Sequence, residues 1–185
     1  MSSVFFKPTP DQIRAAVNKT VPDIIAPNLK ILFCGINPGL YTAAVGHHFA
    51  RPGNRFWPSL FKAGLTPRLF SPFEEEKLLP LGFGITNLVK RATAAASEIQ
   101  KDEFKVGAIE LEKKAARYKP KVVAILGVEA YRAAFNRSKA NVGKQDELLA
   151  NAKLWILPNP SGLNAHYQID ALAKRFKDVN DYAQG

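Results

Sequence analysis

Two polar turns follow apolar runs near opposite ends of the sequence. Asn37 follows the run ILFCGI and precedes a Pro-Gly pair, and Asn159 follows KLWILP and precedes Pro160-Ser161. An asparagine amide can orient a water molecule or a polar ligand, but it cannot take a proton as a general base does. If both runs are parallel strands of one sheet, both turns lie at the sheet edge where α/β folds bind ligands. The matched turns predict a single cleft, although for either turn alone an Asn-Pro loop cap is the simpler interpretation.

A third polar segment, GHHFARPGNRFW, covers residues 46–57. An aromatic side chain in a Gly/Pro-rich loop beside a cleft can stack on a flat ligand such as a base, and Phe49 has that context. The alternative is that Phe49 anchors the loop on the core. His47 and His48 are adjacent, so their side chains point apart and cannot form a same-face metal pair. We therefore expect neither a metal nor a cofactor.

The overall composition indicates a polyanionic partner. The chain has 185 residues, a formal net charge of +10 and one cysteine, Cys34. Such a charge favours nucleic acid as the partner, and a basic enzyme without one is the alternative. No apolar run approaches the ~20 residues of a membrane helix, so no membrane association is expected. A single cysteine excludes an intrachain disulfide and a cysteine-ligated cluster, and its apolar surroundings indicate a buried small residue.

Short apolar runs alternate with helical patterns along the chain. Pro120 ends the clearest helix, which begins near Lys101, and a Thr9–Gln12 capping box begins the first one. This alternation predicts an α/β fold, a three-layer α/β/α arrangement with a short, mainly parallel central sheet of about four to five strands. We expect one domain over 1–185, with 1–21 as a helical extension. The strands are expected near 30–36, 83–89, 121–127 and 152–158, further helices near 54–64, 71–81, 128–135 and 164–183, and loops over 38–55 and 136–152.

Four motifs carry a resemblance to a known family. GINPGL, GHHFARPGNRFW, GITNLVKRAT and LPNPSGL occur in the same order as in the mismatch-specific uracil/thymine DNA glycosylases of the uracil-DNA glycosylase superfamily, which the chain resembles over about 22–178. The resemblance implies a monofunctional enzyme that initiates base excision repair by hydrolysing the N-glycosidic bond of uracil mispaired with guanine. Thymine and ethenocytosine are the further substrates it implies. It also implies double-stranded DNA with a mismatched or damaged base as the partner, a monomer, and an intracellular location, cytoplasmic or nuclear.

The same resemblance implies roles for individual residues in the base pocket. Asn37 would position the attacking water, and Phe49 would stack on the flipped-out base. Backbone amides near Ile36 and Phe49 would contact the pyrimidine edge. The remaining pocket residues that it implies are Thr42, His48, Asn54 and Asn87.

The last motif would supply the contacts with the DNA duplex. Leu163 would enter the gap left by the flipped base, and Gly162 would let the backbone approach the opposite guanine. Family members usually have Arg two positions after the Leu163 site, where this chain has Ala165, so dependence on an opposite guanine is left open. The further expected DNA contacts are Asn159 and Asn164, with Ser161, Arg51, Arg55 and Lys144 at flanking phosphates.

Three other functions are compatible with the same residues. A superfamily member of broader specificity would accept single-stranded uracil or deaminated purines. A DNA-binding module without catalytic activity would use only the basic surface. A small-molecule nucleotide-binding protein is the most distant possibility, because CGINPGL matches neither phosphate-binding glycine motif.

Overall fold

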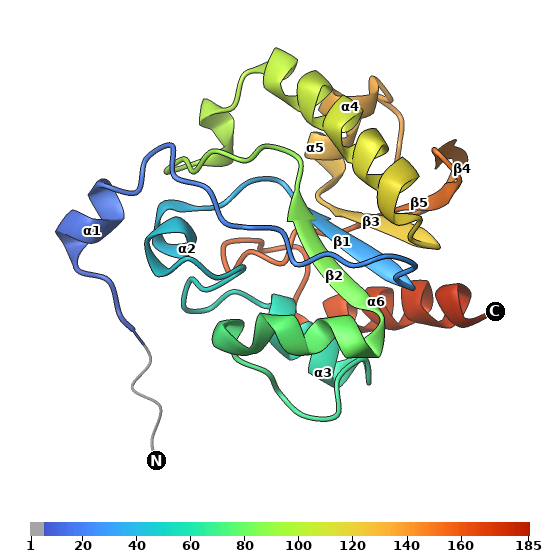
Figure 1. The fold of residues 1–185 in the computed structure, drawn as a ribbon, viewed down its shortest axis with the longest axis horizontal. Helices are drawn as coiled ribbons and strands as arrows, with labels where there is room; N and C mark the ends of the chain where they lie inside the picture. Colours follow the sequence, from blue (N-terminus) through green and yellow to red (C-terminus); the bar gives the residue numbers. More distant parts are fainter. Residues whose placement is uncertain (1–5) are drawn as a thin grey trace.

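A single sheet runs through the computed structural model, which describes residues 6–185 (Figure 1). Within that range the sheet order is β2-β1-β3-β5-β4, and β4 alone runs antiparallel, against β5. This confirms the predicted mainly parallel sheet. The strands are β1 Ile31–Gly35, β2 Phe83–Asn87, β3 Val122–Leu126, β4 Gly143–Leu149 and β5 Ala152–Leu157.

The inner strands form because their residues are apolar on both faces. Every residue of β1, β2 and β3 is buried, as expected for parallel strands covered by helices on both sides. β4 lies at the sheet edge, and its residues GKQDELL are mostly polar and partly exposed. The prediction of a loop over 136–152 is therefore wrong, because backbone pairing with β5, rather than an apolar pattern, makes this segment a strand.

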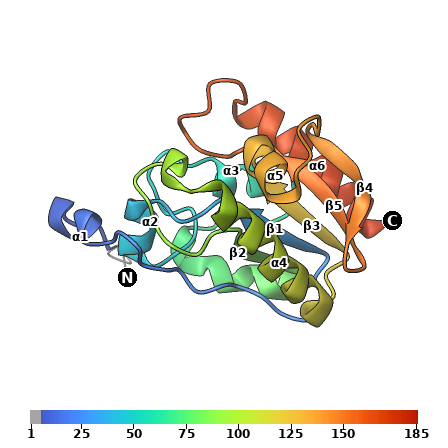
Figure 2. The same cartoon turned by 90° about the horizontal axis from the view of Figure 1, so that it is seen from above.

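Helices cover both faces of the sheet (Figures 1 and 2). On one face, Phe56 and Phe176 pack on Phe33 of β1, with ring centroids 5.6 and 5.5 Å away. On the other face, Leu111 and Tyr131 belong to the second core cluster. This confirms the three-layer arrangement. The helices are α1 Pro10–Arg14, α2 Leu40–Val45, α3 Phe56–Lys62, α4 Lys101–Tyr118, α5 Val128–Phe135 and α6 Ile169–Gln184, with 3₁₀ helices η1 Pro72–Leu81 and η2 Ala96–Glu98.

One helix was not predicted, and another begins later than predicted. The long loop expected over 38–55 contains α2, which begins at Leu40 directly after the first polar turn. The last helix begins at Ile169 instead of near 164, because the residues between fold into a loop closed by their own side chains. The predicted capping box of the first helix is confirmed, with Gln12 N 3.3 Å from the Thr9 hydroxyl oxygen.

The N-terminal segment packs against the elements that surround the candidate site. Ala16 and Val21 form a small apolar cluster with Ala43 of α2 and Ala92. The backbone of Ala92 also exchanges hydrogen bonds with this segment, through Asn18 N and Lys19 O. Part of the expected extension, residues 1–5, lies outside the described range. No helix among residues 6–185 is both long enough and apolar enough to cross a membrane.

Candidate active site

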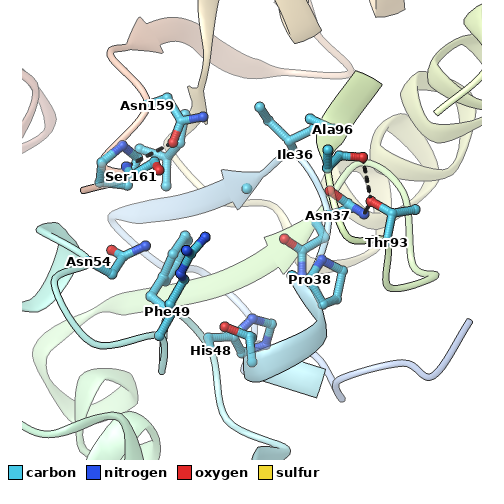
Figure 3. A pocket seen from close by; sticks show the side chains of 18 of the residues that line it. Ile36, Asn37, Pro38, His48, Phe49, Asn54, Thr93, Ala96, Asn159 and Ser161 are labelled. Atoms are coloured by element: carbon cyan, nitrogen blue, oxygen red, sulfur yellow. Dashed lines mark hydrogen bonds between the residues drawn. The ribbon is translucent and has the colours of Figure 1, made fainter. Parts of the chain in front are cut away.

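The carboxyl ends of four strands surround one cavity of about 150 Å³ (Figure 3). Asn37 follows β1 and Asn159 follows β5, and both line it, so the two polar turns do meet in one cleft. The residues that line the cavity are Gly35, Ile36, Asn37, Pro38, Gly39, Thr42, His48, Phe49, Arg51, Asn54, Asn87, Thr93, Ala94, Ala95, Ala96, Leu126, Asn159, Pro160 and Ser161.

The side chain of Asn37 is oriented by two hydrogen-bond acceptors. Its Nδ2 donates to the Arg91 carbonyl at 3.0 Å. It also donates to the hydroxyl oxygen of Thr93 at 2.8 Å, and both of these residues, Asn37 and Thr93, are labelled in Figure 3. The Thr93 hydroxyl donates its own proton to the Ala95 carbonyl at 2.8 Å, so it must accept from Asn37. A carbonyl can only accept, so the nitrogen of the amide is identified without ambiguity. The Oδ1 of Asn37 is therefore the atom available to a water or ligand in the cavity.

One partner of Asn37, Arg91, is itself held in place from α4. Arg91 donates from Nε and Nη2 to the two carboxylate oxygens of Glu103, at 2.6 and 2.9 Å. This paired geometry, together with the backbone N–H of Gln100, lowers the pKa of Glu103 to about 2. Arg91 and Thr93 are functional residues that were not predicted, although both lie in the motif GITNLVKRAT. Nothing local distinguishes them, because their role arises from contact with a turn more than 50 residues away.

Phe49 forms one wall of the cavity and is held from behind. Its ring stacks on Phe56, with centroids 4.1 Å apart, while its backbone has a positive φ of 53°. The neighbouring His48 carbonyl accepts a hydrogen bond from Trp57 Nε1 at 3.1 Å. The two interpretations of Phe49 are thus compatible, since the ring packs on the core and also lines the cavity.

Gly35 and Asn87 form the floor of the cavity at the ends of β1 and β2. They are paired in register across the two strands. A Cβ atom on Gly35 would lie 2.4 Å from Asn87 Oδ1 and 3.3 Å from Cζ of Phe49. The Asn87 amide therefore lies directly over Gly35 beside the aromatic ring. Only glycine leaves room for this arrangement.

His48 lines the cavity but is almost fully buried, with 1% of its surface exposed. Its Nε2 lies 2.8 Å from the Pro22 carbonyl, which can only accept, so Nε2 carries a proton. Burial lowers the pKa of the His48 imidazole. His47 instead contacts Glu75, with 2.8 Å between Nδ1 and Oε1. The adjacent histidines thus face different partners, as predicted.

The other predicted pocket residues also line the cavity. Thr42 lies in α2 and is buried, and Ile36 is half-buried in the turn after β1. Asn54 Oδ1 accepts the backbone N–H of Phe56 at 2.9 Å and so supports the beginning of α3. All six predicted pocket residues are therefore brought together with Asn37.

The loop over residues 159–167 is shaped by its own asparagine and serine side chains. Asn159 Oδ1 accepts from Ser161 N at 2.9 Å, and Asn164 Nδ2 donates to the Asn159 carbonyl at the same distance. The hydroxyl oxygen of Ser161 accepts from Leu163 N at 3.2 Å. These bonds leave the Leu163 side chain 77% exposed at the loop tip. Ala165 is also exposed in this loop.

The structure places the three basic residues that are predicted to contact phosphate differently from one another. Arg51 is exposed and lines the cavity. Arg55 points its guanidinium at backbone carbonyls of loop 159–167. Lys144 lies on the edge strand β4 with its Nζ 5.2 Å from the Tyr182 ring, and it does not line the cavity. The phosphate contacts of all three stay predictions.

The cavity is chemically neutral apart from two side chains. Of the residues that line it, only His48 and Arg51 carry titratable groups, and none is aspartate, glutamate or lysine. The polar groups directed at this space are amides and hydroxyls. Such a site can orient a water molecule and hydrogen-bond a planar polar ligand that is stacked on an aromatic ring.

Comparison with known proteins identifies a family and a related fold. Residues 22–184 match the family model of the Uracil DNA glycosylase superfamily. The chain is also similar to the solution NMR structure of a candidate uracil DNA glycosylase from Methanosarcina acetivorans, with a TM-score of 0.61 and 19% sequence identity. That similarity covers 91% of this chain and 99% of the other. At this identity the structural match shows the fold alone.

Proposed function

Because the chain belongs to the uracil DNA glycosylase superfamily, we propose that it hydrolyses the N-glycosidic bond of uracil mispaired with guanine. Thymine and ethenocytosine opposite guanine are the further substrates that we propose. The observation that carries the proposal is the orientation of Asn37, whose amide nitrogen is committed to two acceptors and whose Oδ1 is free for water.

The proposed reaction begins with a base flipped out of the duplex into the cavity. The base stacks on Phe49, and the Asn87 amide, which lies beside that ring, hydrogen-bonds its polar edge. A water molecule donates a hydrogen bond to Asn37 Oδ1 and attacks C1′ of the deoxyribose. As the water oxygen bonds to C1′, the C1′–N bond breaks and its electron pair leaves with the base as an anion, and the proton released from the water passes to bulk solvent. Hydrogen bonds from the pocket stabilise the departing anion.

The site lacks a strong acceptor for the proton of that water. Asn37 cannot act as a base, and no carboxylate lines the cavity. Nε2 of His48 is a donor to Pro22, and burial lowers the pKa of this imidazole, so its other nitrogen, Nδ1, is only a weak base. Catalysis then relies on positioning and on stabilising the leaving base, which supports a slow enzyme. Selectivity for mismatched bases follows, because a weakly paired base costs less to extrude.

The absence of lysine from the cavity lining supports a monofunctional enzyme. Without an amine nucleophile the sugar forms no Schiff base with the protein. Borohydride added during the reaction should therefore trap no covalent complex with DNA. A trapped complex would contradict the monofunctional mechanism while leaving base excision itself in place.

A panel of labelled oligonucleotides tests the proposal directly. Uracil, thymine, ethenocytosine and hypoxanthine are each placed opposite guanine, and uracil is also tested in single-stranded DNA. We expect excision of uracil opposite guanine by the wild type, and loss of excision with retained DNA binding in Asn37→Ala. Binding without excision of any base would indicate a non-catalytic module. Comparable excision of hypoxanthine or single-stranded uracil would indicate the broader-specificity alternative.

A further inference from the structure

Leu163 is held in an exposed position at the tip of a loop whose core contacts lie at its two ends, Pro160 and Tyr167. The side chain is 77% exposed, whereas large apolar side chains are ordinarily buried. Its neighbours Gly162, Ala165 and His166 are exposed as well. Hydrophobic packing therefore does not set the conformation of the loop tip, which depends on hydrogen bonds within the loop and from groups outside it.

One side chain outside the loop supplies most of those bonds. The Arg55 guanidinium donates from Nη1 to the carbonyls of Asn164 at 2.7 Å and Tyr167 at 3.0 Å. It makes longer contacts with two more carbonyls, those of Ser161 at 3.4 Å and Gly162 at 3.3 Å. The planar fork of an arginine suits several acceptors at once, and its charge strengthens each bond. The four carbonyls come from both sides of Leu163, so Arg55 closes the loop around its tip.

The backbone around Arg55 joins the same loop. Its N–H donates to the Pro160 carbonyl at 2.8 Å. A Cβ atom on Gly162 would lie 2.6 Å from the Gly53 carbonyl oxygen, so the two loops touch through their backbones. This contact explains the glycine at 162 within the protein, without reference to a guanine. The next residue, Phe56, stacks on the ring of Phe49. Two adjacent residues therefore support the aromatic wall of the cavity and the loop that carries Leu163.

We propose that Arg55 is a positioning residue that presents Leu163 to the duplex and thereby promotes extrusion of the base. The inference rests on the proposed function and adds a role for a residue that sequence analysis assigned to phosphate. Arg55 acts through the loop, because its guanidinium is directed at loop carbonyls. Bond cleavage in a base that is already unpaired should not need it.

Arg55→Met tests this role by comparing paired with unpaired substrate under single-turnover conditions. For uracil opposite guanine in a duplex we expect excision to slow by roughly 10- to 100-fold, the scale of a displaced positioning element. For uracil in a mismatched bubble or in single-stranded DNA we expect the rate of excision to change by less than about threefold. Leu163→Ala should show the same selective loss. Arg55→Lys keeps the charge but loses the fork, and it should be intermediate.

Hydrogen exchange provides a readout that does not depend on activity. The amides of Leu163, Asn164 and His166 donate to acceptors inside the loop. In Arg55→Met these amides should exchange faster, while the amides of the central strands keep their protection and so show that the protein is folded. Arg51→Met is the matched control, because Arg51 is a nearby arginine of the same segment that lines the cavity but makes no hydrogen bond to the loop within the described residues. Arg51→Met should bind DNA more weakly, and its binding should depend less on salt concentration. The amides of the loop should not exchange faster in this variant.

Two results would overturn the inference. The first is equal slowing on duplex and unpaired uracil, which would place Arg55 in the cleavage step or in general stability. The second is unchanged exchange in the loop of Arg55→Met. A wild type that excises no base from any substrate would refute the proposed function, and the extrusion role with it, while the exchange data would still decide whether Arg55 orders the loop.

Discussion

The amide nitrogen of Asn37 lies 2.8 Å from the hydroxyl oxygen of Thr93, which can only accept this bond because its proton is donated to the Ala95 carbonyl. The relationship decides which end of the Asn37 amide is available to the cavity. A reversed amide would place Oδ1 against the Arg91 carbonyl and leave two acceptors facing each other. The orientation of one functional group is thus determined by a segment that follows a different strand.

Asn37→Asp should lower the rate of excision instead of introducing a general base. One carboxylate oxygen would face the Arg91 carbonyl, an acceptor that cannot pair with it. We expect excision of uracil opposite guanine to fall by about tenfold or more at neutral pH, as for other misplaced groups. The measurement is the single-turnover rate of excision by Asn37→Asp, compared with the rates of the wild type and of Asn37→Ala. An increase toward the ~10²- to 10⁴-fold gain of a general base would show that the carboxylate reorients toward the water.

Thr93→Val should weaken both catalysis and stability. The change removes one acceptor of Asn37 and the donor to Ala95 while nearly keeping the volume of the side chain. We expect excision about tenfold slower on the positioning scale, and a free energy of unfolding lower by about 1–3 kcal/mol for the unpaired groups. Urea denaturation and single-turnover kinetics measure the two effects. Thr93→Ser keeps the hydroxyl and should retain most of the wild-type rate and stability. Wild-type kinetics in Thr93→Val would rule out a role for Thr93 in positioning Asn37.

Gly35→Ala should block the base pocket from its floor. The added methyl group would lie 2.4 Å from Asn87 Oδ1 and 3.3 Å from the Phe49 ring, so the amide must move. We expect excision to fall by roughly 10²-fold for a displacement of this kind. Gly39→Ala is the matched control at the same cavity, because its methyl group meets nothing within 4 Å. Equal losses in the two variants would argue against steric displacement of Asn87.

His48 should make the protein less stable in mild acid. Burial lowers the pKa of the folded-state imidazole from the ordinary value of 6.5. Between the two pKa values the unfolded chain binds more protons than the folded one, so the free energy of unfolding rises with pH. This stability is fully present above pH 6.5 and is lost as the pH falls through the folded-state pKa.

Urea denaturation at a series of pH values measures the contribution of His48. In His48→Gln the part of the pH dependence that lies below pH 6.5 should become smaller, because no imidazole is left to protonate there. The variant can still donate to the Pro22 carbonyl, which His48 Nε2 contacts at 2.8 Å. An unchanged slope in His48→Gln would assign the acid sensitivity to another group.

Much of the fold could be predicted because its signals are local. The apolar runs of β1, β2 and β3 are buried on both faces, and Thr9 with Gln12 marks a helix start through neighbouring residues. The placement of both polar turns at one edge followed from the parallel direction of the strands. The prediction was wrong where the signal was not local, because β4 is a strand only through its pairing with β5.

The sequence by itself determined the order of the elements and the residue types that meet at the cavity, since both depend on apolar periodicity, turns and motifs within short segments. Only the tertiary structure decided how those side chains are held. Asn37 takes its orientation from Arg91 and Thr93, and loop 159–167 is closed from outside by Arg55, over separations of more than 50 and more than 100 residues. A hydrogen bond depends on distance and direction in space, and no local pattern encodes which distant carbonyl a side chain will reach.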